Sequence, residues 1–290
     1  MIYLLLSALL YSLNNLLWKK VLQQDNSWLI MTLRALLTSI IGIVVVLRYY
    51  PNLLNQISKD SFCRVTIASM LGAFGLIFMI SALKKGTLRL LGIFNLLTIA
   101  FTVTYLLLFE KFNILNYLSG TSLIILGFSI YIFQIKKTPT EEFTGKVVIY
   151  YTLMSLFFAS SGMVHWYNFK QSISPLFSVV NQEIIVFLLG VTGLWLQPKS
   201  LKTQWLQTIE KSSYLLIGMA VLIFAAVWTG FLGLKSTNPL LSSLLSLSIP
   251  ILTIFFGALF FKEKLNKSIF LSLLIITIGA FILHFKLNQF

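Results

Sequence analysis

Long apolar runs dominate the chain, and short polar segments separate them. Read between the charged residues, the pattern contains ten runs, each close to the ~20 residues that a helix needs to cross a bilayer. A membrane-spanning β-strand would instead alternate polar and apolar positions over about ten residues. The pattern therefore predicts an all-α polytopic membrane protein with ten transmembrane helices. These cover residues 1–19, 27–48, 62–84, 89–109, 114–135, 147–170, 175–196, 213–234, 239–261 and 267–286.

Turn residues support several of these boundaries. Ser174-Pro175 and Asn238-Pro239 each have the pattern of an N-cap followed by proline at the first helical position. The first apolar run lacks a small-residue cleavage site and leads directly into Lys19-Lys20. It is therefore expected to be a retained first span rather than a signal peptide.

The two halves of the chain resemble each other. SALLYSLNNLLWKK, residues 7–20, matches SLFFASSGMVHWYN, residues 155–168, in the spacing of Ser7, Ser12 and Trp18. LLLFEKFNILNYLSGTSLIILG, residues 106–127, matches ALFFKEKLNKSIFLSLLIITIG, residues 258–279. The most polar mid-chain segment, KKTPTEEFTGK, separates the two sets. We expect a first repeat at residues 1–136, a linker at 137–146 and a second repeat at 147–290.

Each predicted repeat holds five spans, and an odd number places the second repeat in the membrane upside down. Such inverted repeats are common in secondary transporters, whose binding site lies near the midplane between the repeats. The repetition alone also fits a channel or a purely structural membrane protein.

The segments ALKKGT and GLKSTNPLL, with SIPILTIFFGALFFKEK that follows, are similar to the two EamA-type repeats of the drug/metabolite transporter superfamily. The resemblance covers nearly the whole chain and implies ten helices and ATP-independent export or uptake of small metabolites. One departure is Pro250 in the ninth span, since the matching region near Leu97 has no proline. The absence of a GxxxxGK[ST] motif agrees independently with transport that does not use ATP.

Composition supports a membrane protein. The chain is 58% hydrophobic and 10% charged, with a mean hydropathy of +0.90, whereas soluble domains carry about 25% charged residues. The net charge of +14 comes from short basic clusters between apolar runs, which is typical of headgroup anchoring rather than nucleic-acid binding. A single cysteine, Cys63, excludes an internal disulfide. We expect no metal and no cofactor.

Polar residues inside predicted spans are the candidate site residues, because polar groups at membrane depth are costly and usually face the bundle interior. Asn14 and Asn15 point about 100° apart on a helix, so one can line a cavity while the other bonds a neighbouring helix. Arg34 lies early in the second span, where it either snorkels to the headgroups or binds a carboxylate.

Glu183 lies early in the seventh span and is nearly the repeat counterpart of Arg34, which aligns with Gln182. We expect both charges to approach the cavity from opposite halves. Glu183 can pair with Arg34, bind a substrate amine or carry a coupling proton. His165, late in the sixth span, is either a proton relay or an interfacial residue.

Phe74, Phe78 and Trp228 are predicted to form an apolar wall of the same site. Glu110 and Glu263 each adjoin lysine at a helix end and are expected to close loops rather than bind substrate. Small residues spaced seven apart predict close helix packing for the fifth and tenth spans: Gly120, Gly127, Ser272 and Gly279.

The function predicted from these features is a secondary active transporter, an exporter of small metabolites such as amino acids that works by alternating access. A multidrug or cation exporter is the alternative, followed by a non-transporting scaffold; an enzyme is not expected. The expected partners are a small-molecule substrate and the lipid bilayer, with a monomer or homodimer in a bacterial inner membrane. The excess of Lys and Arg in odd-numbered connections favours external termini, whereas the resemblance implies cytoplasmic ones.

Overall fold

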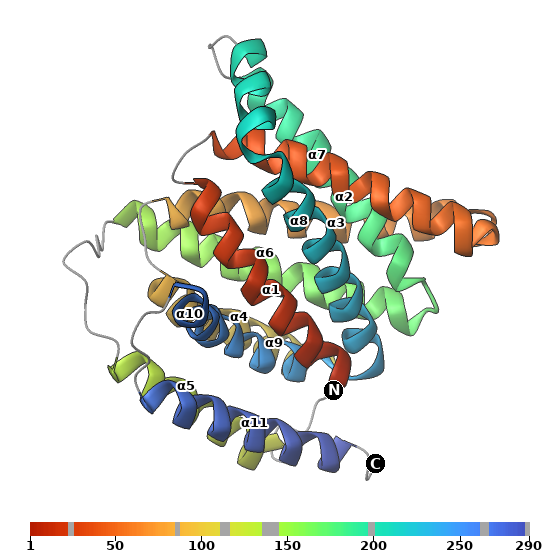
Figure 1. Ribbon diagram of the computed structural model, residues 1–290. Coiled ribbons are helices and arrows are strands. Elements are labelled where there is room, and N and C mark those ends of the chain that lie inside the picture. The colour runs from red at the N-terminus through yellow and green to blue at the C-terminus, as the bar shows by residue number, and fades with distance from the viewer. Residues whose placement is uncertain are drawn as a thin grey trace.

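The computed structural model describes residues 1–22, 26–84, 88–110, 117–134, 145–196, 201–261 and 267–287. Every regular element in these ranges is a helix, as the sequence predicts (Figure 1). The elements are α1 (Ile2–Leu22), α2 (Ser27–Tyr49), the 3₁₀ helix η1 (Pro51–Gln56), α3 (Lys59–Leu83), α4 (Leu88–Phe109), α5 (Leu118–Gln134), α6 (Gly145–Lys170), α7 (Pro175–Trp195), α8 (Leu201–Ser236), α9 (Pro239–Ser246), α10 (Ser248–Phe261) and α11 (Lys267–Leu287).

Seven helical segments in the described ranges are long and apolar enough to cross a membrane. There are also three shorter apolar helical segments in the described ranges: Ile2–Trp18, Leu118–Phe133 and Ile269–Leu283. The protein is therefore an integral, multi-pass membrane protein by helix length and composition. Ten crossings stay a prediction. The expected linker at residues 137–146 lies outside the described residues except for the start of α6.

The predicted ninth span consists of two helices, α9 and α10, because the helix is interrupted at Leu247. The cause is Pro250, which has no backbone N–H to offer the carbonyl of Ser246 and whose ring crowds that carbonyl. Near the break, the hydroxyls of Ser246 and Ser248 donate to the carbonyls of Ser243 and Leu245, both at 2.6 Å. Hydroxyls thus satisfy carbonyls around the interruption.

The predicted caps differ in chemistry. Asn238 accepts a hydrogen bond from the backbone N–H of Leu241 at 2.8 Å and starts α9, with Pro239 following it. Ser174 also occupies the N-cap position before Pro175, but its side chain makes no capping bond. Asn238 therefore begins its helix by a side-chain cap, whereas the start of α7 depends on the fixed backbone of Pro175.

Helices from the first half pack mainly on helices from the second. α1 lies against α8, α3 against α6, α2 against α7, and α5 against α11. The start of α1 and the end of α11 lie at the same end of the bundle (Figure 1). The core therefore forms between the two halves rather than inside each.

α5 and α11 lie side by side at one edge of the bundle (Figure 1). A Cβ atom built on Gly120 would lie 2.8 Å from the carbonyl oxygen of Gly279, and one on Gly127 would lie 2.9 Å from that of Ser272. The four small residues singled out in the sequence are thus the contact between these helices. Without side chains there, the backbones approach closely.

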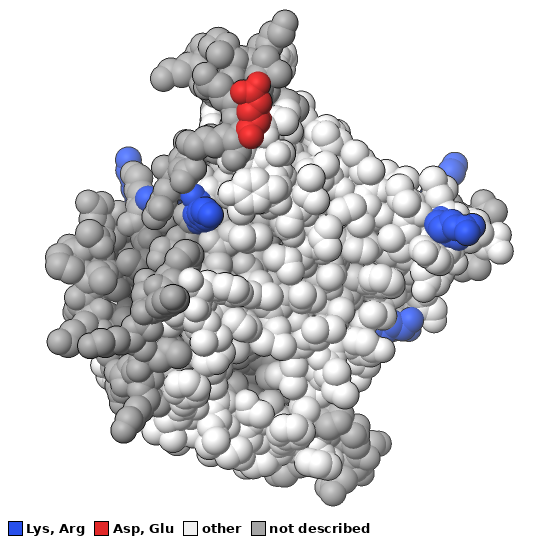
Figure 2. Space-filling view, viewed as in Figure 1, with Lys and Arg blue, Asp and Glu red and all other residues white. Residues whose placement is uncertain are grey.

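The exterior suits lipid. Figure 2 shows a broad face without charge, and the Lys, Arg, Asp and Glu residues that are visible lie near its margins. Exposed apolar side chains on α2 include Ile40, Val44 and Leu47, which are 49%, 58% and 59% exposed. A surface of this kind is covered by acyl chains rather than by water.

Gly120→Val is expected to lower the thermal-unfolding midpoint of the protein in detergent, since the new side chain meets backbone of α11 that cannot move aside. Overpacking of this kind costs on the order of 1–3 kcal/mol. Gly218→Val is the control, because a Cβ there has its nearest neighbour, a Leu17 methyl, at 3.8 Å. Equal midpoints for the two variants would contradict the close α5–α11 contact.

Candidate functional site

A cavity of about 310 Å³ lies between helices of both halves. This volume is at the lower end of the ~300–1,000 Å³ range of small-molecule sites. Eight helices, α1 to α4 and α6 to α9, and the start of α10 contribute to its wall. The cavity is therefore a product of the whole bundle, and no single repeat forms it.

One face of α1 lines this cavity. Tyr11, Asn14, Asn15 and Trp18 follow the i, i+3, i+4, i+7 spacing of a single helix face. Both asparagines thus lie at the cavity, and Asn14 is only 2% exposed. The Oδ1 atom of Asn14 has no hydrogen-bond partner among the described residues, so it is available to a solute. Trp18, 4% exposed, is buried in the same wall.

Hydroxyl and amide groups of α4 and α9 form the opposite polar wall. Asn95, Thr98 and Thr102 share one face of α4, and the Thr102 Oγ1 atom lies 3.2 Å from Ser243 Oγ on α9. Sequence reasoning missed these residues, because Ser and Thr in apolar helices are commonly satisfied by a carbonyl of their own helix. The i, i+3, i+7 spacing on α4 was the available signal.

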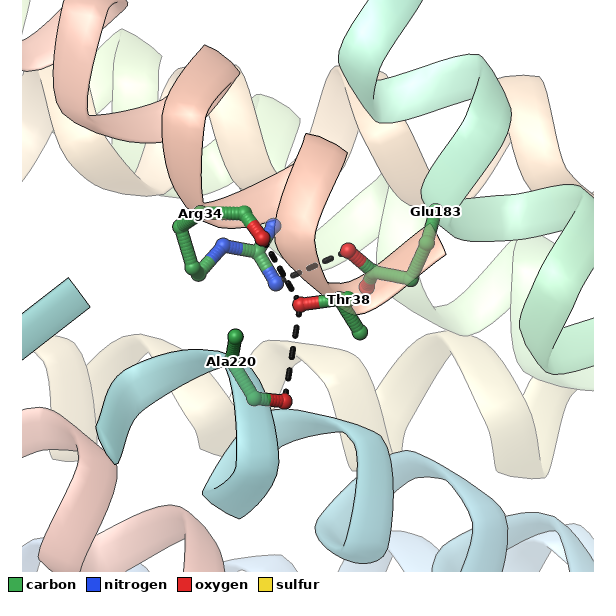
Figure 3. Close-up of polar contacts among 4 residues, drawn as sticks. All are labelled: Arg34, Thr38, Glu183 and Ala220. Carbon is green, nitrogen blue, oxygen red and sulfur yellow. Dashed lines mark hydrogen bonds and ion pairs between the residues drawn. The ribbon is translucent and has the colours of Figure 1, made fainter. Parts of the chain in front are cut away.

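Arg34 and Glu183 form an ion pair inside the bundle, with Arg34 Nη1 2.9 Å from Glu183 Oε2. Figure 3 shows the two side chains pointing toward one another from α2 and α7. They are 1% and 2% exposed, and both line the cavity. Neither Nε nor Nη2 of Arg34 has a hydrogen-bond partner among the described residues. The guanidinium therefore keeps donors for a further anionic group.

The backbones around this pair are held close together. A Cβ on Gly42 of α2 would lie 2.8 Å from Val180 Cγ2 of α7, and one on Gly190 of α7 would collide with Thr32 of α2. Thr38, one turn after Arg34, donates to the Arg34 carbonyl at 2.8 Å and lies 3.5 Å from the Ala220 carbonyl of α8 (Figure 3). Tight α2–α7 packing thus brings the two charges together.

A second cavity, of about 200 Å³, adjoins the first. Gln182, which aligns with Arg34 when the sequences of the two halves are compared, lines both cavities. His165 lines the second cavity and is fully buried, with its ring 4.4 Å from that of Phe231 and 5.9 Å from that of Phe169 between centroids. His165 therefore lies in the interior of the bundle, against the second cavity.

The structure does not bring the predicted aromatic wall to the cavity. Phe74 and Phe78 occupy the side of α3 opposite Gly72, Leu76 and Met79, and both rings pack on Phe157. Phe74 is 37% exposed. The apolar part of the wall instead includes Leu76, Met79, Leu91, Ile223 and Val227.

Trp228 is also absent from the cavity lining. Its ring packs against Phe224, 5.6 Å away between centroids, on the next face of α8 from Val227. A shift of one residue, about 100° around a helix, separates a lining position from a packing position.

Glu110 lies outside both cavities, as expected from its place at a helix end. Its carboxylate accepts from Lys170 Nζ at 2.9 Å, and the same ammonium lies 3.6 Å from the centroid of Trp166. Glu263 lies outside the described residues. No three His, Cys, Asp or Glu side chains of the described ranges gather as a metal site requires.

Helices with an apolar exterior, which enclose a cavity that holds an ion pair and several amides, define the class: an integral, multi-pass membrane protein with an internal cavity. Residues 145–285 match the EamA-like transporter family. This part of the chain is thus an EamA-like transporter domain, of the drug/metabolite transporter type, as the sequence resemblance predicted.

One solved structure, titled only "Crystal structure of protein", resembles the chain with a TM-score of 0.75 at 15% identity, covering 99% of this chain and 97% of that one. At this identity the likeness shows a shared fold. No curated protein matches the sequence.

Arg34→Met is expected to destabilise the detergent-solubilised protein strongly, since it leaves the Glu183 carboxylate buried without its counter-charge. Removing one partner of a buried pair costs about 3–5 kcal/mol, whereas replacing both by apolar groups of similar size is often neutral. The double variant Arg34→Met/Glu183→Met should therefore recover most of the lost thermal midpoint. If the double variant instead lost the sum of the midpoint losses of Arg34→Met alone and Glu183→Met alone, the two side chains would not be coupled in stability.

Proposed function

We propose that this protein is a secondary active transporter that moves small zwitterionic metabolites, such as amino acids, outward across the cytoplasmic membrane. The observation that carries the proposal is the Arg34–Glu183 pair in the wall of an interior cavity beside the amides of Asn14 and Asn15. Buried charges in a membrane bundle are costly and mark solute or ion pathways by default.

Charge balance favours a zwitterion over a hydrophobic cation. Arg34 and Glu183 are the charged members of the described cavity wall, so the wall has no net charge. A guanidinium suits a carboxylate, and a carboxylate suits an ammonium group. An amino acid supplies both partners at once, whereas a cation would meet Arg34 as well as Glu183.

Contacts between the halves support an inverted repeat and, with it, alternating access. At a sequence shift of 148, Gly42 corresponds to Gly190 and Thr32 corresponds to Val180. The contact of Gly42 with Val180 therefore has a counterpart in the contact of Gly190 with Thr32, in which the two halves have changed places. The contacts of Gly120 with Gly279 and of Gly127 with Ser272 exchange in the same way at a shift of 152. The pairing of α1 with α8 likewise corresponds to that of α6 with α3.

Such exchange is the property of two copies related by a two-fold axis, with repeats at residues 1–136 and 147–290 and ten spans in total. The binding site then lies at the interface of the repeats, where rocking exposes it to either side in turn.

The driving force we propose is a proton gradient or the gradient of the solute itself. Glu183 and His165 are the groups that would carry a coupling proton, since both are buried and face the cavities. A carboxylate that exchanges partners between Arg34 and a solute amine links its charge state to solute binding.

Arg34→Ala and Glu183→Gln are each expected to reduce amino-acid counterflow in proteoliposomes by about tenfold or more, because a lost charge-assisted contact in a dry site costs a factor of this order. Arg64→Ala and Glu110→Gln are matched controls, since these charges pair near helix ends away from the cavities. Arg34→Met/Glu183→Met, which is expected to recover the thermal midpoint, should be equally inactive and so separates stability from transport.

Wild-type counterflow by both Arg34→Ala and Glu183→Gln would overturn the site assignment. Resistance to hydrophobic cations that depends on Glu183, without amino-acid flux, would instead select a multidrug exporter. Absence of any solute flux would leave a structural role.

A further inference from the structure

The second cavity shares much of its wall with the first. Tyr11, Gly72, Phe158, Gly162 and Gln182 are among the residues that line both. The two spaces therefore adjoin, and a solute that enters one can extend into the other. The proposed function uses only the first, around the Arg34–Glu183 pair.

Gly162 lies at this junction for a reason other than helix packing. A Cβ built on it meets no atom within 4 Å, whereas one on Gly72, across the same junction, would lie 3.0 Å from Ser161 Oγ. No glycine among the described residues has a positive φ angle, so the backbone at 162 accepts any residue. Glycine costs a helix interior about 1 kcal/mol relative to alanine. What glycine provides here is open space between the cavities.

The chemistry of the second cavity differs from that of the first. No charged residue belongs to its described wall. The hydroxyls of Ser7, Ser161 and Ser246 donate to the carbonyls of Ala226, Ala68 and Ser243 at 2.8, 2.8 and 2.6 Å. Their oxygens therefore face the cavity as acceptors.

His165 adds the most polar group of this wall. The ring is fully buried, and neither nitrogen makes a well-aligned hydrogen bond with a described residue, although Gln182 lies close. A hydrocarbon tail would leave the nitrogens of this ring desolvated and the acceptor capacity of the serine oxygens unused, which is unfavourable. A neutral group that carries an N–H or O–H satisfies them.

We propose that the two cavities form one binding site with two compartments, and that Gly162 sets how far a solute reaches into the second. The first compartment takes the zwitterionic end of an amino acid. The second takes a neutral side chain that ends in a hydrogen-bond donor, such as a carboxamide. This inference rests on the proposed function and adds the class of side chain.

Proteoliposome counterflow with labelled L-alanine, L-glutamine, L-methionine, L-glutamate and L-lysine tests it. For the wild type we expect L-glutamine to exceed L-methionine, which has similar length but no donor, and to exceed both charged amino acids. Gly162→Leu should lower the ratio of L-glutamine flux to L-alanine flux about tenfold, because steric exclusion of a few atoms has effects of this size.

Gly218→Leu is the matched control, because a Cβ on Gly218 has only a Leu17 methyl within 4 Å, at 3.8 Å, and Gly218 lines neither cavity. It should transport like the wild type. His165→Phe keeps an aromatic ring against Phe231 and Phe169 and removes the ring nitrogens. It should lower the ratio of L-glutamine flux to L-methionine flux toward one.

The outcomes separate the two proposals. If the wild type carries L-alanine and L-glutamine but Gly162→Leu affects both equally or neither, the two-compartment site is overturned and the proposed function stands. A wild type that prefers L-methionine, L-glutamate or L-lysine also overturns it. If the wild type carries none of these amino acids, the proposed function itself fails and the inference fails with it.

Discussion

The structure depends on one constraint: a guanidinium and a carboxylate are held away from both water and lipid, and each is the other's charged neighbour. Desolvating two ions costs several kcal/mol each, and their attraction offsets this only at short distance. The 2.9 Å contact of Arg34 with Glu183 meets that condition. It also requires α2 and α7 to stay close, which the glycines at 42 and 190 permit. The pair therefore ties the position of the cavity to the packing between the two halves.

The sequence predicts the location of a side chain well when that side chain is unfavourable in most environments of a bilayer. Amides and charges such as Asn14, Arg34 and Glu183 are expensive in acyl chains, so their depth in apolar runs placed them in the interior. For phenylalanine and tryptophan, lipid, a packed core and a cavity wall are all favourable environments. For Phe74, Phe78 and Trp228, depth therefore carried no information about which face they occupy.

The rotation of each helix about its axis explains most of the remaining differences between the predicted site residues and the observed cavity lining. The cavity face of α3 carries Gly72, Leu76 and Met79, and composition alone cannot distinguish this face from its opposite. Hydroxyl residues such as Thr98 and Ser243 escaped notice, since most such groups in membrane helices bond a carbonyl of their own helix. The presence of Pro250 did not predict the helix interruption at Leu247, because proline in a membrane helix is commonly tolerated with only a kink.

Neutrality of the whole site argues for what it can carry. With Arg34 and Glu183 paired, the empty cavity has no net charge in its described wall, and a bound zwitterion leaves that sum at zero. Under the proposed function, loading would need only an exchange of partners: the solute carboxylate would contact the guanidinium as the solute amine contacts the carboxylate. A lone cation or anion would add an uncompensated charge at membrane depth, which costs far more than the exchange. In the transport that we propose, the ion pair thus leaves the described cavity wall without net charge in both the empty and the loaded state.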